Sequence, residues 1–146
     1  MKFPRLSFLL FAVLALFACK DDKLRVGKYG MMDPNVPEYA AVEFFDYIYH
    51  DKTLDNALTK ASPNLARLIQ SYNTNKNVQR HILNLRFDTV EITPHATGAG
   101  RNQFAKETKI FVYFEGKLNG ELIKDMRVVD LVRIDDSWKV DKISLN

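Results

Sequence analysis

The chain has 146 residues, of which 47% are hydrophobic, 12% aromatic and 27% charged, which is the composition of one ordinary globular domain. Its single Cys excludes a disulfide scaffold and any metal or iron–sulfur site built from several thiolates of one chain. From residue 37 onward 15 Lys or Arg balance 15 Asp or Glu, so the chain lacks the cation surplus that nucleic-acid binding requires, and we expect no nucleic-acid partner.

The N-terminus has the three zones of an export signal. Lys2 and Arg5 form a positive head, residues 6–18 form an almost unbroken apolar run, and the lone Cys19 follows. A helix of this length spans only about 20 Å, against a hydrocarbon core of about 30 Å, so the run is too short for a stable membrane-spanning helix. The sequence therefore predicts a signal peptide over residues 1–18.

The end of the apolar run, Leu16-Phe17-Ala18-Cys19, resembles the lipobox of bacterial lipoproteins. The resemblance implies cleavage before Cys19 and acylation of its sulfur and its new amino group. Several acyl chains on one residue make a durable anchor, because each buried methylene contributes about 0.8 kcal/mol. In this class of lipoproteins, an Asp directly after the Cys is similar to a signal for retention in the inner membrane. This chain has Lys20 at that position, which implies anchoring at the periplasmic face of the outer membrane. An ordinary signal peptide with an unrelated Cys is the alternative.

Residues 19–36 mix charges with glycines and a proline and show no sustained hydrophobic period, which indicates a lipidated tether. A flexible coil of this length would separate the domain from its anchor by about 23 Å. The folded unit is then residues 37–146, which is long enough to bury roughly two-thirds of its unfolded surface without disulfides or metals.

The first part of this domain is predicted to be helical. The dense apolar positions of residues 38–50 are typical of a central helix that is buried over a wide face. A second helix is expected with Thr53 as its N-cap. A third begins at Ser62 and Pro63, because Ser accepts an unpaired amide and Pro has none to lose. The apolar spacing in residues 78–85 indicates a fourth helix.

From Phe87 the apolar period becomes two, which predicts strands. The first strand is expected to end at Pro94. A long hairpin follows with its turn at residues 119–120, an Asn-Gly pair that suits the positive φ angles of a type I′ turn. A second turn at residues 135–136 brings back the last strand.

Pairing outward from the first turn places Glu115 opposite Lys124 and Lys109 opposite Asp130, and the opposite charges support this register. The register sorts the side chains of the sheet into two faces. We expect the helices to cover the face that carries Thr108, Ile110, Val112, Phe114, Val129, Leu131, Trp138 and Val140. The second face is apolar enough to form a homodimer or to be covered by the tether, because it carries Phe111, Tyr113, Met126 and Val128.

Helices followed by a meander that closes with Asp135-Asp136-Ser137-Trp138-Lys139-Val140 resemble the NTF2-like (cystatin-like) α+β fold. Residues 38–61 and 78–90 are similar to a set of small uncharacterised Gram-negative lipoproteins that bear such a domain. The resemblance covers residues 37–145. It implies N-terminal helices packed on a curved antiparallel four-stranded sheet, with a cavity that relatives use for enzymes, ligand carriers or interaction modules.

Asp125, Arg127 and His81 are the candidate cavity residues. Asp125 and Arg127 are neighbours on the face assigned to the core, and His81 lies on the apolar side of the fourth predicted helix. Burying an ion costs several kcal/mol unless it is paired. The two charged residues are therefore either a structural pair at the cavity rim or polar groups that contact a ligand.

The sequence carries no motif for metal binding, for serine hydrolase chemistry or for a glycine-rich phosphate loop. His50, His81 and His95 show no metal-ligand spacing, no serine lies in a Gly-x-Ser-x-Gly elbow, and the glycines of residues 98–100 open no helix. We expect no metal, no cofactor and no catalytic residue. One asymmetry remains between Asp55 and Asp88, where the chain has no acid. This stretch is either a solvated surface or a basic face for an anionic headgroup, a cell-wall polymer or an acidic partner: Lys60, Arg67, Lys76, Arg80 and Arg86.

The sequence thus predicts a non-enzymatic, lipid-anchored periplasmic module that binds an envelope protein or a cell-wall component. One alternative is a small cavity enzyme with isomerase-like or dehydratase-like acid–base catalysis, in which Asp125 or His81 is the base. The other is a carrier of a small apolar ligand.

Overall fold

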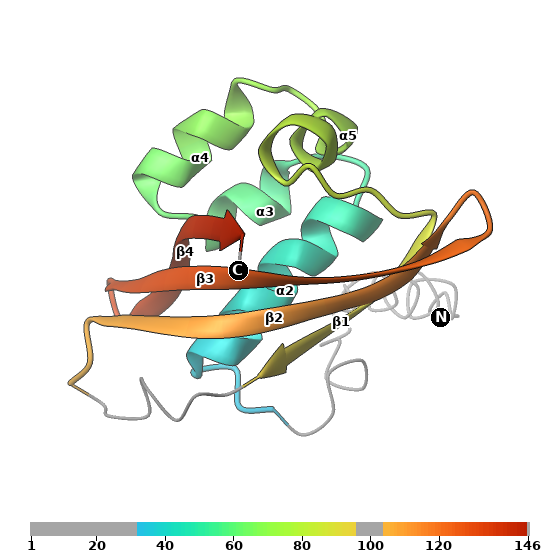
Figure 1. The fold of residues 1–146 in the computed structure, drawn as a ribbon. Helices are drawn as coiled ribbons and strands as arrows, with labels where there is room; N and C mark the ends of the chain where they lie inside the picture. Colours follow the sequence, from blue (N-terminus) through green and yellow to red (C-terminus); the bar gives the residue numbers. More distant parts are fainter. Residues whose placement is uncertain (1–31, 96–103, 146) are drawn as a thin grey trace, which may run out of the picture. The chain divides into compact units, whose positions relative to one another are not determined.

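The computed structural model describes residues 32–95 and 104–145, which are coloured in Figure 1. The expected signal peptide, Cys19, most of the expected tether and the glycines at 98 and 100 lie outside the described residues. Among the described residues, no helix combines the length and the apolar character that crossing a membrane requires.

A four-stranded antiparallel sheet follows a group of helical segments, so the domain has the α+β architecture that the sequence predicts. The strands lie in the order β1-β2-β3-β4, and every neighbouring pair is antiparallel. The helical segments are α2 (Pro37–His50), α3 (Asp55–Lys60), α4 (Pro63–Gln70), α5 (Asn75–Asn77) and the π-helical turn η2 (Val78–Ile82). The strands are β1 (Thr89–His95), β2 (Glu107–Leu118), β3 (Glu121–Ile134) and β4 (Ser137–Leu145).

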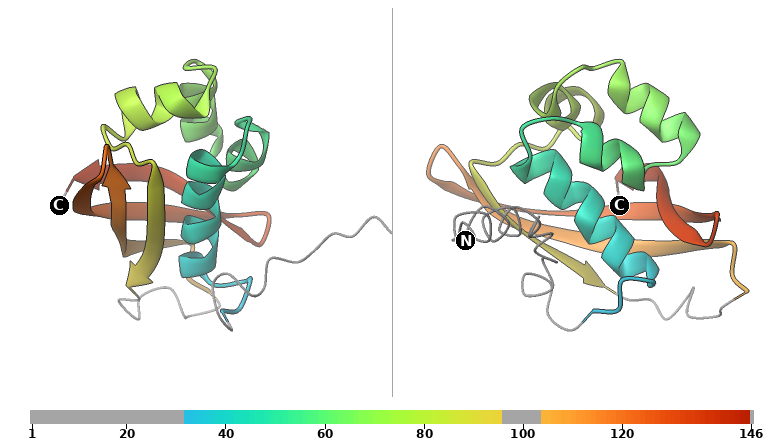
Figure 2. Two further views of the ribbon diagram at one scale, coloured as in Figure 1. Left: turned by 90° about the vertical axis from the view of Figure 1, so that its right-hand side faces the viewer. Right: turned by 180° about the vertical axis from the view of Figure 1, so that it is seen from behind.

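The predicted central helix is α2, which packs along one face of the sheet (Figure 2). It begins at Pro37, where a missing N–H costs no hydrogen bond. Four of its fully buried apolar residues follow the spacing of one helical face, namely Ala41, Phe44, Phe45 and Ile48, and Val42 is fully buried beside them. The ring of Phe45 meets that of Phe114 in β2 edge-on, with centroids 4.9 Å apart. Helix and sheet therefore share one core.

The N-cap of α4 is predicted correctly, and the N-cap of α3 is not. Ser62 caps α4, because its hydroxyl accepts a hydrogen bond from the Leu65 N–H at 3.3 Å, as expected. The predicted Thr53 cap is wrong. Leu54 is the N-cap of α3, and the Thr53 hydroxyl donates to the Asp55 carboxylate at 2.9 Å. The helix begins one residue later than predicted, and no side-chain oxygen accepts from its first N–H groups.

The fourth predicted helix is present only as the short α5 and the turn η2. It starts earlier than predicted, because the Thr74 side chain accepts from the Asn77 N–H at 3.2 Å and caps α5. It ends after η2, where the Leu83 N–H donates to the Val78 carbonyl at 3.0 Å. Asn84 then takes a φ of 46°, a left-handed conformation that Asn tolerates better than most residues and that stops the helix.

The hairpin has the predicted turn and register. Residues 119–120 have φ angles of 53° and 85°. Glu115 pairs with Lys124 and Lys109 with Asp130. The lysine nitrogens lie 2.8 Å and 3.3 Å from the respective carboxylate oxygens. The second predicted turn is also present, since residues 135–136 have φ angles of 47° and 59°.

The first strand runs further than predicted. β1 continues through Pro94 to His95, so the expectation that Pro94 ends the strand is wrong. β1 is an edge strand, and a residue without an N–H is tolerated at an edge.

Both predicted sheet faces exist. All eight residues assigned to the helix-covered face are buried. On the second face Phe111, Met126 and Val128 are half-buried and Tyr113 is 45% exposed. A homodimer through this face, or a tether covering it, stays a prediction.

Candidate functional site

Asp125 and Arg127 form an ion pair on the inner face of β3. An Nη atom of Arg127 lies 3.2 Å from a carboxylate oxygen of Asp125, and the two side chains are 4% and 28% exposed respectively. The other Nη donates to the carbonyl oxygen of Leu83 at 3.1 Å. The guanidinium thus has acceptors on both of its terminal nitrogens, which offsets the cost of burying a cation. This geometry favours the structural pair over a pair of ligand-binding groups.

Tyr49 of α2 binds the same turn. Its hydroxyl donates to the carbonyl oxygen of Leu85 at 3.0 Å. Burial raises the pKa of the Tyr49 phenol above its ordinary value, the charge of Arg127 lowers it and the charge of Asp125 raises it. The phenol therefore stays a protonated donor at neutral pH. Side chains from the sheet and from the central helix bind the carbonyls on both sides of Asn84.

His81 does not join these residues. Its side chain is exposed and stacks on the ring of Tyr72, with centroids 5.8 Å apart. The prediction assumed a regular α-helix, whereas His81 lies in the π-helical turn η2, whose wider turn shifts every following side chain around the axis. The structure brings Asp125 and Arg127 together and leaves His81 on the surface.

A surface hollow of about 420 Å³ lies beside the turn that carries Asn84. Its residues come from two parts of the chain, residues 80–86 and the β2–β3 hairpin. Three of them are apolar and buried or half-buried, namely Leu85, Leu118 and Ile123. The other three are exposed and polar, namely Arg80, Asn84 and Arg86. No acidic side chain lines this hollow.

The predicted basic face divides into paired and unpaired cations. Lys60 lies 2.6 Å from the carboxylate of Glu43, and Arg67 donates to the Asn64 side chain at 2.5 Å. The side chains of Arg80 and Arg86 make no hydrogen bond or ion pair with residues 32–95 or 104–145. Lys76 likewise has no partner among the described residues, but it does not line the hollow, whereas Arg80 and Arg86 both do.

A second hollow, of about 480 Å³, lies at the β-bulge between β3 and β4. It is lined by three acidic residues, Glu107, Asp130 and Asp141, together with Lys109. Asp130 already pairs with Lys109 at 3.3 Å. Within the described ranges no group of three or more His, Cys, Asp or Glu has the geometry to hold a metal ion.

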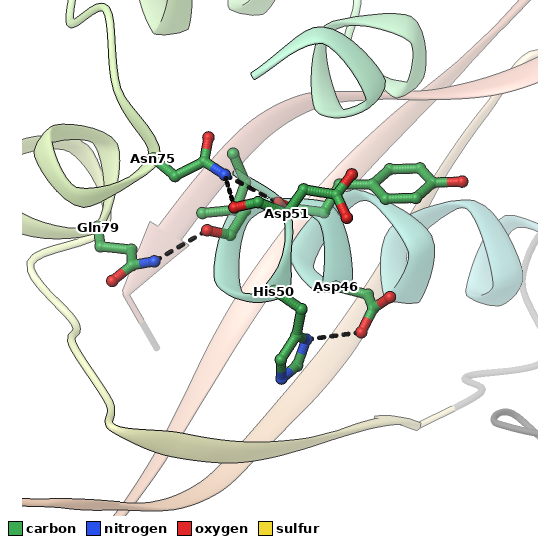
Figure 3. Close-up of polar contacts among 7 residues, drawn as sticks. Asp46, His50, Asp51, Asn75 and Gln79 are labelled. Carbon is green, nitrogen blue, oxygen red and sulfur yellow. Dashed lines mark hydrogen bonds and ion pairs between the residues drawn. The ribbon is translucent and has the colours of Figure 1, made fainter. Parts of the chain in front are cut away.

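Asp46 and His50 form a carboxylate–imidazole contact that the sequence analysis did not identify. The Nδ1 atom of His50 lies 2.7 Å from Asp46 Oδ1, and the two side chains are 35% and 1% exposed respectively. A dashed line joins them in Figure 3. Their i, i+4 spacing on α2 was the available signal. The same contact orients the histidine of many acid–base enzymes.

The last turn of α2 is tied to α5 and η2 by two amides (Figure 3). Nδ2 of Asn75 lies 2.7 Å from the Asp51 carbonyl oxygen and 3.1 Å from that of Tyr47. Gln79 donates to the Ile48 carbonyl at 2.8 Å. The Tyr47 carbonyl also accepts from the Asp51 N–H, but the last carbonyls of a helix otherwise have no intrahelical partner, and Gln79 supplies one for Ile48. The two amides thereby position residues 75–86 against the core.

No protein-family model, no curated protein and no solved structure matches this chain.

Proposed function

We propose that this chain is a lipid-anchored, non-enzymatic binding module at the periplasmic face of the outer membrane. Residues 1–18 act as its signal peptide, acylated Cys19 as its anchor, residues 19–36 as a tether, and residues 37–146 as a binding domain of NTF2-like (cystatin-like) type. The four-stranded antiparallel sheet with helices on one face supports that type of domain. The apolar run that ends at the chain's single Cys supports the anchor.

The observation that carries the binding role is the contrast between the inner and the surface cations. The buried Arg127 has a carboxylate and a backbone carbonyl as partners, so it has a structural explanation. The exposed Arg80 and Arg86 line a hollow and have no partner among the described residues. The buried Arg127 therefore needs no ligand, whereas the exposed Arg80 and Arg86 can bind one.

A small acid–base enzyme is the second candidate, and the Asp46–His50 contact favours it. Neither of the two hollows described above is lined by Asp46 or His50. An isomerase-like or dehydratase-like activity that is lost in His50→Gln and kept in His81→Gln would favour this candidate. His81→Gln is the matched control because His81 is exposed and touches no carboxylate among the described residues.

Membrane fractionation of Cys19→Ser tests the anchored module. The unchanged chain is expected in the outer-membrane fraction, with an intact mass that includes acyl chains. Cys19→Ser is expected to lack those chains and to be released from the membranes, and an unchanged fractionation and mass would contradict the anchor. Lys20→Asp keeps the acylation site and is expected to move the protein toward the inner membrane. An unacylated Cys19 in protein extracted from membranes would refute the anchor.

A further inference from the structure

The hollow beside Asn84 has two chemically different sides. Its apolar side consists of Leu85, Leu118 and Ile123. Its polar lining residues are Asn84 and the two cationic residues Arg80 and Arg86. An apolar wall suits the body of a small organic molecule, and two guanidinium groups suit an anionic head.

The acidic residues close in sequence to the lining residues of the hollow form no ion pair with Arg80 or Arg86 in the described part of the chain. Asp88 accepts a hydrogen bond from the Asn119 N–H at 2.7 Å, where it binds the hairpin turn. Asp125 pairs with Arg127. Glu121, at the first position of β3, does not line the hollow. Arg80 and Arg86 therefore line the hollow without an ion-pair partner among the described residues.

The turn that presents these groups is fixed before any ligand arrives. Arg127 donates to the Leu83 carbonyl, and Tyr49 donates to the Leu85 carbonyl. The Leu85 N–H donates to the Gln79 carbonyl at 2.9 Å. A π-helical turn of the kind that precedes this segment is rare and frequently occurs at functional sites. Fixing the backbone in advance lowers the ordering cost of binding.

We infer that this hollow binds a phosphate group carried on a short apolar body. The inference rests on the proposed binding role and names its ligand class. Two positive charges match a phosphate monoester, which carries nearly two negative charges at neutral pH, better than a single carboxylate. The planar guanidinium binds phosphate oxygens in pairs, which a lysine ammonium does not do. The apolar side of the hollow distinguishes an organic phosphate from inorganic phosphate.

Isothermal titration of butyl phosphate into the protein, purified in a neutral detergent, tests the inference. Butyl phosphate is expected to bind about tenfold more tightly than inorganic phosphate, because only it contacts the apolar side. Arg80→Gln and Arg86→Gln are each expected to weaken butyl phosphate binding about tenfold. Arg67→Gln is the matched control, because Arg67 is exposed and lies outside the hollow, and it should bind like the parent.

Phosphatidic acid doped into the micelles distinguishes the two sources of such a ligand. Displacement of butyl phosphate assigns the hollow to a lipid headgroup, and undiminished binding assigns it to a soluble organic phosphate. No binding of butyl phosphate, or an equal loss in Arg67→Gln, would overturn the inference. The membrane fractionation of Cys19→Ser is independent of this titration, so failure of the phosphate site and failure of the anchored module are distinguishable.

Discussion

The guanidinium of Arg127 on β3 donates to the carbonyl oxygen of Leu83, 44 residues earlier in the chain, at 3.1 Å. The same guanidinium pairs with Asp125 at 3.2 Å. One buried side chain thus neutralises an acid of the sheet and binds the end of the helical segment. The position of residues 83–85 depends on the sheet as much as on local sequence.

Replacing Arg127 by Met should destabilise the domain by about 3 kcal/mol, because hydrogen bonds to a charged group are lost and their acceptors are left without a partner. Asp125→Asn should cost less, about 1.5 kcal/mol, because Asp125 is 28% exposed and the amide oxygen still accepts. Urea unfolding followed by circular dichroism measures both. Lys124→Met, in a pair whose side chains are 64% and 55% exposed, is the control and should cost under about 0.5 kcal/mol. A midpoint for Arg127→Met equal to that of the control would contradict the structural role.

Tyr49→Phe removes the donor to Leu85 and should cost about 1 kcal/mol at pH 7. A second effect appears at high pH. Burial raises the pKa of Tyr49 in the folded state above the ordinary value of 10.0, so above that pH the unfolded chain loses a proton that the folded chain keeps. The free energy of unfolding therefore falls as the pH rises past 10.

Unfolding midpoints between pH 8 and about 11 measure this effect. Tyr49→Phe should show a shallower alkaline loss of stability than the parent. Some slope should remain, because burial and Glu43 also raise the pKa of Tyr39. Parallel stability curves for parent and variant would show that the phenol titrates alike in both states.

Local signals were predictable from the sequence, and contacts between distant segments were not. The hairpin register follows from one turn and two charge pairs that lie close to it in sequence. The Ser62 cap is likewise a signal within four residues. His81 was misplaced because helical spacing does not reveal a π-helical turn. The hollow was not predictable, since Arg80 and Ile123 meet only after the sheet and helices pack.

Asn75 offers a test of the contact between α2 and α5. Its amide nitrogen lies within 3.2 Å of the carbonyl oxygens of Tyr47, Asp51 and Thr53. Asn75→Ala should cost about 2 kcal/mol, because the carbonyl oxygens of Asp51 and Thr53 lose this donor, while that of Tyr47 keeps the Asp51 N–H. Asn75→Asp should cost more at pH 7, because a carboxylate then faces carbonyl oxygens with no donor between them.

The comparison of these two variants is also sensitive to pH. Lowering the pH from 7 to about 4 protonates the introduced carboxyl, which can then donate one hydrogen bond. The stability gap between Asn75→Asp and Asn75→Ala should therefore narrow in acid. Thermal unfolding of both variants at the two pH values measures the gap. A gap that widens in acid would show that the Asn75 amide does not face these carbonyls.

Two glycines of the hairpin should respond differently to the same substitution. A Cβ at Gly116 would lie 2.6 Å from the ring of Phe87 and 3.0 Å from Val90 Cα, and closer still to the Thr89 carbonyl oxygen. Because Thr89 and Val90 contribute backbone atoms of β1, the strand itself must move. Gly116→Ala should therefore cost about 3 kcal/mol, the upper range for overpacking.

Gly120→Ala adds a Cβ that meets nothing within 4 Å, but the residue has a φ of 85°. The cost is then local backbone strain alone, about 1 kcal/mol. Urea unfolding of the two variants separates steric exclusion in the sheet from strain in the turn. The β1–β2 packing requires a larger loss at Gly116, because only there does the new methyl group collide with a paired strand. Equal losses at the two positions would mean that β1 can shift away from β2 without cost.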